Sequence, residues 1–323
     1  MNMRFARKID SRHVFDLILT HELHEYSKYP FMDKGKLRKY IFNQVANLMK
    51  DNNSRIIVYV ENYKVIGLVT LTRLLWDTRH FGFGMGKIGY FIGEGSYPRS
   101  IKIKKDLLQF IFKLCRDWKF RHLSCRMHAK DIASAHVLEG EGFRIMDTFV
   151  TYVSSKACKK GLNIKDLYKV RIFKKRDLLK LVRLAKTNFS ANRFYRDHRF
   201  ESNKASELYG EWIKNYCYGR GGGKVIISED SHKDAVGFLA YKLNADWAKV
   251  GYKVIGEGLA VVSPEAKGSF PSLVKEINQL VPHPYDYAEF DTRLDNFEAI
   301  KVYQKFGFTF AKAKHTFHKW LDS

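Results

Sequence analysis

An internal repeat is the feature that most constrains the fold of this chain. Residues Arg121 to Phe143 and Asp286 to Phe308 align without a gap at a constant shift of 165 residues. In each copy, a polar turn separates an apolar segment from apolar residues at helical spacing that end at a Gly-Phe pair. A repeated pattern of this kind indicates a repeated supersecondary unit, so the sequence predicts two similar domains in tandem.

The two copies differ at the positions where side chains could take part in chemistry. Asp131 aligns with Asn296, and Leu138 aligns with Tyr303. Only the second copy therefore keeps a carboxamide and a phenol one to two helical turns apart. From this difference we predict that the first domain does not catalyse a reaction.

The length of the chain agrees with a division into two domains. Its 323 residues exceed what a single core usually supports, which favours two domains of about 160 residues each. A polar, basic segment from Lys156 to Lys165, which includes Gly161, is the expected linker. We predict domains at residues 1–158 and 166–323. The fold class is α/β (α+β), with a mixed sheet flanked by helices in each domain.

Composition indicates a packed globular protein without a membrane span. The hydrophobic fraction is 45%, and no apolar run approaches the ~20 residues needed to cross a bilayer. The first residues show no apolar export signal, which favours a cytoplasmic location. The four cysteines have no metal-binding or disulfide spacing, so no metal is expected. They are Cys115, Cys125, Cys158 and Cys217.

The formal net charge of +23 indicates that the surface attracts anionic partners. The basic residues are spread over both halves, and no helix-turn-helix, RRM signature or zinc-finger spacing is present. Nucleic acid is therefore not the favoured partner. A polyanionic cofactor and a nucleotide-linked substrate would account for part of the charge.

Two glycine-rich segments look like nucleotide loops but lack the required spacing. Trp76 to Gly86 has Lys87 where a third glycine would belong, and the expected structure is a bulged or closely approached strand. Gly219 to Lys224 is flanked by Tyr218 and Val225 where a phosphate loop needs glycine and a hydroxyl residue. We expect a turn that joins a helix to a strand there.

The pattern Asn296, Ala299, Tyr303 and Gly307-Phe308 resembles the last helix of the GNAT acetyltransferases. The resemblance implies that Asn296 opens this helix beside the thioester of acetyl-CoA and that Tyr303 lies near the sulfur, where it acts as the acid. A core role for the Tyr303 ring stays open, because the helix face also needs apolar bulk.

The same resemblance implies a coenzyme A site after the apolar strand Val254 to Val262. Phe270 stands where the family has its first required glycine, and Pro271 removes one backbone donor. An ordinary strand-to-helix turn is therefore the alternative. The implied cofactor-binding residues, besides Asn296, are Leu259, Ala260, Val261, Lys267, Gly268, Ser269, Phe270 and Ser272.

Two further segments resemble the TDP-fucosamine acetyltransferase branch of the GNAT enzymes. Trp76 to Gly86 matches its WD-x-x-x-FG stretch, and Ser190 to Ile213 resembles its acceptor side. For the aromatic residues packing is the favoured interpretation over substrate contact, and for Asp291 it is a salt bridge with Arg293. The general base is left unassigned. The candidate substrate-binding residues are Arg193, Phe194, Asp197, Tyr209, Trp212, Glu257, Asp291 and Arg293.

The sequence therefore predicts an acetyl-CoA-dependent N-acetyltransferase that acts on a primary amine of a nucleotide-linked amino sugar. One alternative is a GNAT enzyme with another amine acceptor or a longer acyl donor. Another is a non-catalytic binding module that uses its basic surface, because a fold does not fix a function. The oligomeric state is left open.

Overall fold

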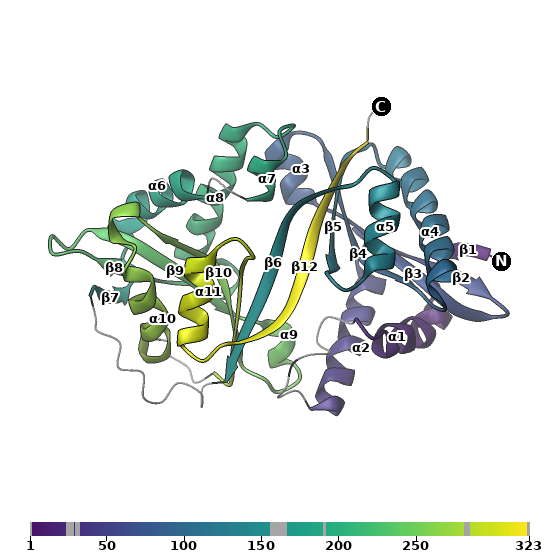
Figure 1. Cartoon of the computed structure of the whole chain (residues 1–323), viewed down its shortest axis with the longest axis horizontal. Helices are drawn as coiled ribbons and strands as arrows, with labels where there is room; N and C mark the ends of the chain where they lie inside the picture. The colour runs from purple at the N-terminus through teal and green to yellow at the C-terminus, as the bar shows by residue number, and fades with distance from the viewer. Residues whose placement is uncertain are drawn as a thin grey trace. The chain divides into compact units, whose positions relative to one another are not determined.

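The computed structural model describes residues 2–23, 29, 33–155, 167–189, 192–280 and 285–321. The chain divides into two compact units (Figure 1). Unit 1 comprises Met1–Thr148 and Lys312–Ser323, and unit 2 comprises Phe149–Ala311. This division differs from a single boundary along the sequence. Residues 149–155 belong to unit 2, and residues 312–323 belong to unit 1. The predicted linker lies outside the described residues.

Unit 1 contains a mixed sheet in the strand order β1-β2-β3-β4-β5-β12. Strands β4 and β5 are parallel, and the other neighbours are antiparallel. Alternating apolar residues make most of these strands half-buried or fully buried. The strands are β1 (Asn2–Phe5), β2 (Ser54–Glu61), β3 (Lys64–Arg73), β4 (Gly84–Gly93), β5 (Phe120–His128) and β12 (Thr309–Trp320).

The helices of unit 1 bury apolar faces against this sheet. Along α4, residues Ile103, Leu107 and Ile111 recur at helical spacing and are almost fully buried, which stabilises the unit by about 2 kcal/mol for each side chain. Figure 1 shows α4 and α5 side by side next to β4 and β5, with which α4 makes contact. The helices are η1 (Lys8–Asp10), α1 (Ser11–Thr20), α2 (Lys34–Lys50), α3 (Leu75–Phe81), α4 (Tyr97–Asp117) and α5 (Ile132–Gly140).

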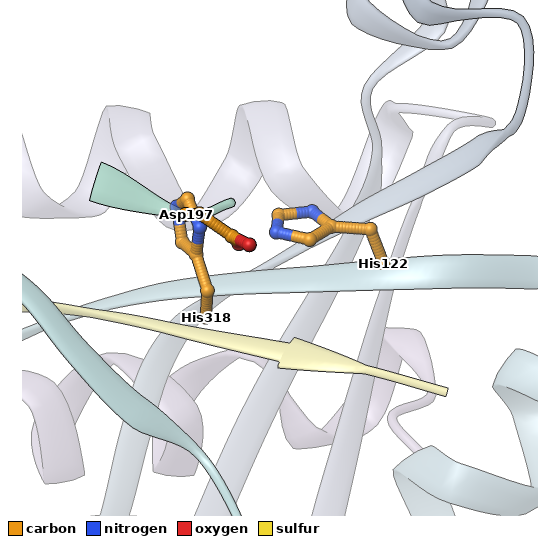
Figure 2. A group of neighbouring side chains, drawn as sticks. All are labelled: His122, Asp197 and His318. Atoms are coloured by element: carbon orange, nitrogen blue, oxygen red, sulfur yellow. The ribbon is translucent and has the colours of Figure 1, made fainter. Parts of the chain in front are cut away.

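The last strand of the chain is part of the core of unit 1. Residues Lys314 to Trp320 of β12 pair with β5, and Phe317, opposite Cys125, is fully buried in the hydrophobic cluster. On the same pair of strands, the rings of His122 and His318 lie edge to face with their centroids 4.5 Å apart (Figure 2). Sequence patterns had assigned no role to β12.

Unit 2 has a matching mixed sheet in the order β6-β11-β10-β9-β8-β7. Its parallel pair is β10 and β11, and its other neighbours are antiparallel. The strands are β6 (Arg144–Ser155, from Phe149 onward in this unit), β7 (Lys169–Ile172), β8 (Lys224–Glu229), β9 (Ala235–Leu243), β10 (Val254–Val262) and β11 (Tyr287–Arg293).

The helices of unit 2 pair with one another over the sheet. Helices α6 and α8 are in contact, as are α10 and α11, which lie side by side in Figure 1. Within the described residues, no helix is long and apolar enough to cross a membrane. The helices are η3 (Lys175–Asp177), α6 (Leu178–Asn188), α7 (Arg193–Arg196), α8 (Ser202–Cys217), η4 (Arg220–Gly222), α9 (Ala245–Ala248), η5 (Pro264–Ala266), α10 (Ser269–Leu280) and α11 (Phe297–Lys305).

The repeat extends to the start of each unit, which the sequence alignment had not reached. Arg4 forms a two-bonded ion pair with Asp10, and Arg171 forms the same pair with Asp177, with N–O distances of 2.5–2.9 Å. In both units this pair ties the first strand to the start of the first helix. The guanidinium of Arg4 lowers the pKa of the Asp10 carboxyl to about 2.

One predicted element is wrong in its first half. Residues Leu75–Phe81, expected as part of a bulged strand, form helix α3, and β4 begins only at Gly84. Gly82 ends the helix in the left-handed conformation, with a φ of 84°, which glycine adopts at little cost. The turn predicted for residues 219–224 is confirmed, since η4 joins α8 to β8.

Candidate functional site

The two parallel strands of unit 2 separate partway along their length. Strand β10 pairs with β11 only from Val254 to Gly256, which lies opposite Glu289. Beyond that point β10 continues to Val262 on β9, whereas β11 continues to Arg293 on β6. Beyond Gly256, the backbone N–H and C=O groups on the facing edges of β10 and β11 therefore do not pair with each other. Backbone groups of this kind need other hydrogen-bond partners.

A β-bulge lies just beyond the point of separation. The register between β10 and β9 shifts between Glu257 and Leu259, which makes Gly258 the extra residue. Leu259 and Val261, both predicted cofactor contacts, are 5% exposed, and Ala260 between them is half-buried. Bulges change the direction of backbone groups, and the N–H groups here lie on the strand that the cofactor would follow.

The predicted pyrophosphate segment forms the start of helix α10. Lys267 is exposed, and only Lys267 and Gly268 separate η5 from α10. Ser269 and Ser272 are almost fully buried, and their hydroxyls have no hydrogen-bond partner within the described residues. Both hydroxyls are enclosed by the protein, so the groups that a ligand could reach at this helix terminus are the exposed Lys267 and the backbone at the start of α10. These residues fit a phosphate-bearing cofactor.

Tyr303 lies in the core of unit 2. Its side chain is 1% exposed, and its ring centroid lies 5.6–5.9 Å from those of Tyr152, Phe270, Phe290 and Phe308. The aligned residue of unit 1, Leu138, is also fully buried. These surroundings are typical of a core aromatic residue. The role of Tyr303 as acid stays a prediction.

Asn296 is the N-cap of α11, as the sequence pattern predicts. Its side-chain oxygen accepts a hydrogen bond from the Ala299 N–H at 3.3 Å, and its amide donates to the Thr292 hydroxyl at 3.0 Å. Both bonds fix the turn between β11 and the helix. A direct role of Asn296 at the thioester stays a prediction.

The predicted acceptor residues fall into two groups. Phe194 and Tyr209 are buried, and Tyr209 lies parallel to Phe189 with 4.4 Å between ring centroids, which fits the packing interpretation. Trp212 is half-buried beside Tyr209, and the Arg193 guanidinium lies 4.5 Å from the centre of the Phe194 ring. Tyr209 and Trp212 thus belong to one group of aromatic rings with Phe189, and Arg193 packs on Phe194, whose ring contacts Phe200.

Two of the three acidic candidates have hydrogen-bond partners in the structure. Asp197, which is buried, accepts a hydrogen bond from the Arg199 backbone N–H, and Asp291 accepts one from the Thr151 hydroxyl at 2.5 Å. Glu257 lies on β10, and its side chain is outside the described part of the structure.

The predicted salt bridge between Asp291 and Arg293 is wrong. Arg293 pairs with Asp295 at 2.8 Å, because the turn after β11 brings that carboxylate within reach, and Arg196 binds the same carboxylate. Burial tends to raise the pKa of Asp295, but the two guanidinium groups hold it below its ordinary value.

One residue that sequence reasoning did not select lies at the bulge. Tyr216, in the last turn of α8, has its phenol against Gly258. The signal that could have found it is the pair of glycines that flank its ring, Gly223 and Gly258, which lie in separate sequence segments.

The corresponding region of unit 1 is occupied by its own side chains. Its bulge falls at Gly89 and Tyr90, and the Tyr90 N–H donates to the Thr70 hydroxyl at 2.9 Å. Nearby, the buried Lys104 ammonium lies 2.8 Å from Asp131 and donates to Ser134. These contacts satisfy the polar groups that a ligand would otherwise bind.

Both members of the buried pair in unit 1 have shifted pKa values. Burial lowers the pKa of Lys104 because it disfavours the charged ammonium. Burial would raise the pKa of Asp131, but the Lys104 charge and the bonds from Ser134 hold it below its ordinary value.

Comparison with known proteins shows which folds this chain resembles. No family model matches the chain. The chain is 24% identical over 140 residues to the spore coat polysaccharide biosynthesis protein SpsD of Bacillus subtilis. The aligned residues make up 42% of this chain. The match spans about half, 45%, of the length of that relative.

Two solved structures match almost the whole chain. A GCN5-related N-acetyltransferase from Sphaerobacter thermophilus superimposes with a TM-score of 0.64 and 11% identity over 99% of this chain and 95% of that one. A tandem GNAT protein from the clavulanic acid biosynthesis pathway gives a TM-score of 0.57 and 13% identity, covering 100% and 99% of the two chains. The chain therefore has a tandem GNAT fold.

Proposed function

We propose that unit 2 transfers an acetyl group from acetyl-CoA to a primary amine. The observation that carries this proposal is the separation of β10 and β11 at Gly256, followed by a bulge and by the start of α10 at the same end of β10. This arrangement offers backbone donors along an extended chain and at a helix terminus, which suits an acyl chain linked to a diphosphate. Unit 1 is proposed to be non-catalytic.

The residues of unit 2 would hold the cofactor in three places. The exposed Lys267 and the first-turn N–H groups of α10 would bind the phosphates. The free edge of β10 from Leu259 to Val261 would hold the extended arm. A backbone N–H at the bulge would face the developing oxyanion. Bound acetyl-CoA supplies the acetyl thioester.

The acceptor that we propose is an amine on a nucleotide-linked amino sugar. The sequence resemblance to the TDP-fucosamine branch supports it, as does the similarity to a protein of polysaccharide biosynthesis in Bacillus subtilis. Arg193, packed on Phe194, and the exposed Arg199 would provide cations for phosphates. Another amine acceptor or a longer acyl donor is the alternative within the same reaction class. A cytoplasmic location is part of the same proposal.

A non-catalytic binding module is the second candidate. Phe270, in the first turn of α10, stands where the family has a glycine, and its ring packs against that of Tyr303. If this contact keeps the cofactor out, unit 2 would retain the fold without the reaction.

Thermal unfolding with coenzyme A separates these candidates. A ligand at 100 times its dissociation constant stabilises the folded state by about 2.7 kcal/mol, so coenzyme A should raise the melting temperature. Lys267→Glu should weaken this shift, because it reverses a charge beside the helix terminus. Arg99→Glu, in the first turn of α4 in unit 1, is the matched control and should leave the shift unchanged.

Acetylation is then measured as thiol release with nucleotide-linked amino sugars and with free amines. Turnover with a nucleotide-linked amino sugar, and none with the free sugar, supports the proposed acceptor. A shift without turnover on any amine favours a binding role, and the absence of any shift contradicts the cofactor site.

A further inference from the structure

The aromatic ring of Tyr216 lies between two glycines from different parts of unit 2. An added Cβ at Gly223 would lie 2.8 Å from the Tyr216 Cδ1 and 3.0 Å from its Cα. An added Cβ at Gly258 would collide with the phenol oxygen and with Cζ of the same ring. The two glycines therefore leave room for this one side chain.

Backbone conformation does not explain why these positions are glycine. Gly223 has a φ of −62° and a ψ of 142°, which any residue adopts, and Gly258 is not among the glycines with positive φ. Three neighbours of Gly223, at positions 219, 221 and 222, do have positive φ. The requirement at Gly223 and Gly258 is therefore close approach of the Tyr216 ring.

The position of Gly258 places the phenol at the centre of the proposed reaction site. Gly258 is the bulged residue of β10 and lies two residues beyond the last pair with β11, or about 7 Å along the strand. Tyr216 is half-buried, whereas Tyr303 is 1% exposed and surrounded by aromatic rings. Of these two tyrosines, Tyr216 is the more exposed, and Gly258, against which its phenol lies, is also exposed.

Unit 1 has a different hydroxyl at its own bulge. There an added Cβ at Gly89 would meet the Thr70 hydroxyl at 2.5 Å, and this hydroxyl accepts the Tyr90 N–H. The threonine comes from the neighbouring strand β3 and satisfies the bulge internally. In unit 2 the phenol reaches the bulge from helix α8 instead.

We propose that Tyr216, rather than Tyr303, is the phenol that assists acetyl transfer in unit 2. This inference rests on the proposed function. The amine nitrogen attacks the thioester carbonyl carbon, a C–N bond forms and the C–S bond breaks. The Tyr216 O–H donates its proton to the departing sulfur, and the proton lost by the amine nitrogen restores the phenol. The products are the acetamide and the free thiol of coenzyme A.

The ordinary pKa values of the groups involved are compatible with this role. A phenol titrates near ~10 and a thiol near ~8.5, so a hydrogen bond that becomes a partial proton transfer is enough to stabilise the departing thiolate. The phenol must be protonated to act, and the rate should therefore fall as the pH rises through the phenol pKa.

Matched phenylalanine variants test the assignment, because each removes one oxygen and keeps the ring. Tyr216→Phe should lower kcat by at least 10²-fold, the usual size of an acid–base contribution, with little change in KM for acetyl-CoA or in the coenzyme A thermal shift. The fall of the rate at high pH should also disappear. Tyr303→Phe should keep kcat within about threefold of the original protein, since the removed hydroxyl lies in the core.

Three outcomes would overturn the proposal. Tyr216→Phe could retain full kcat, or it could retain the fall of the rate at high pH. Alternatively, Tyr303→Phe could show the large loss. In each case the original protein is active, which separates these results from failure of the proposed function. An original protein that releases no thiol with any amine contradicts the enzymatic function itself.

Discussion

Unit 1 and unit 2 build the same strand, turn and helix around different interiors. In unit 1 the helix N-cap is Asp131, whose carboxylate binds the buried Lys104 ammonium. In unit 2 the N-cap is the uncharged Asn296, which bonds to Ala299 and Thr292, and aromatic rings pack beside the helix. One unit thus neutralises a buried charge at this position, and the other has a neutral side chain there.

This difference shows how a repeated fold can lose a binding site and stay folded. A buried ion pair contributes little net stability, but each partner is costly without the other. Lys104 and Asp131 must therefore change together. The Thr70 hydroxyl acts in the same direction, because it accepts a hydrogen bond from the Tyr90 N–H at the bulge of unit 1.

Removal of residues 312–323 should have the largest effect and should affect unit 1 alone. It deletes the strand paired with β5 and the fully buried Phe317, while all of unit 2 remains in the chain. Hydrogen exchange should show loss of protection in α4 and β5 and retained protection in β8 and β9.

Two single substitutions on β12 give unfolding free energies with which the effect of the truncation can be compared. Phe317→Ala should cost about 3–5 kcal/mol, as expected for a buried aromatic residue. The exposed Phe310, on the part of β12 in unit 2, should tolerate alanine within about 0.5 kcal/mol. Full protection of α4 in the truncated chain would contradict the assignment of β12 to the core of unit 1.

Lys104→Met should have the next largest effect. It leaves the Asp131 carboxylate buried without a counter-charge, which costs about 3–5 kcal/mol of unfolding free energy in urea denaturation. The double variant Lys104→Met, Asp131→Asn should recover most of that loss. In unit 2, Asn296→Ala should cost only about 1 kcal/mol, the usual value for an N-cap. Equal losses of unfolding free energy for Lys104→Met and Asn296→Ala would contradict the difference between the two interiors.

A smaller effect than that of Lys104→Met should come from Asp10→Asn, and it should depend on pH. The pKa of Asp10 is about 2 in the folded state, against about 3.9 when unfolded, so its charge stabilises the fold above pH ~4. This stability is lost as the pH falls from ~4 to ~2. The variant should therefore lose about 2 kcal/mol at pH 7, and the difference should vanish near pH 2.

Asp177→Asn is the counterpart in unit 2 and sharpens the comparison. Arg171 also binds Glu229 at 2.6 Å, so its charge keeps a partner when the aspartate is replaced. The loss should be smaller than for Asp10→Asn in urea titrations from pH 7 to pH 2. A loss at position 10 that does not change with pH would exclude the ion pair as its cause.

Local patterns predicted much of the fold because they depend on neighbouring residues. The alignment of Asp131 with Asn296 located two helix N-caps, and apolar alternation located β10 with the bounds Val254–Val262. The tandem arrangement also followed from the repeat alone, since each copy carries its own strand and helix signals.

Features that depend on distant segments could not be predicted in this way. The sequence does not state that β12 pairs with β5, because strand pairing is set by the whole core. The burial of Tyr303 depends on rings from three other elements, although its helical spacing suits either a core or a site. Tyr216 was missed because its meaning depends on two distant glycines.

The position of β12 in the sequence determines the order in which the two units can be completed during translation. A ribosome delivers every residue of unit 2 before it delivers the strand that closes unit 1. The part of unit 1 that is translated first must therefore wait, with one sheet edge open, until all of unit 2 has been made. Such an edge can pair with other chains, so this nascent segment is where a chaperone would be most useful.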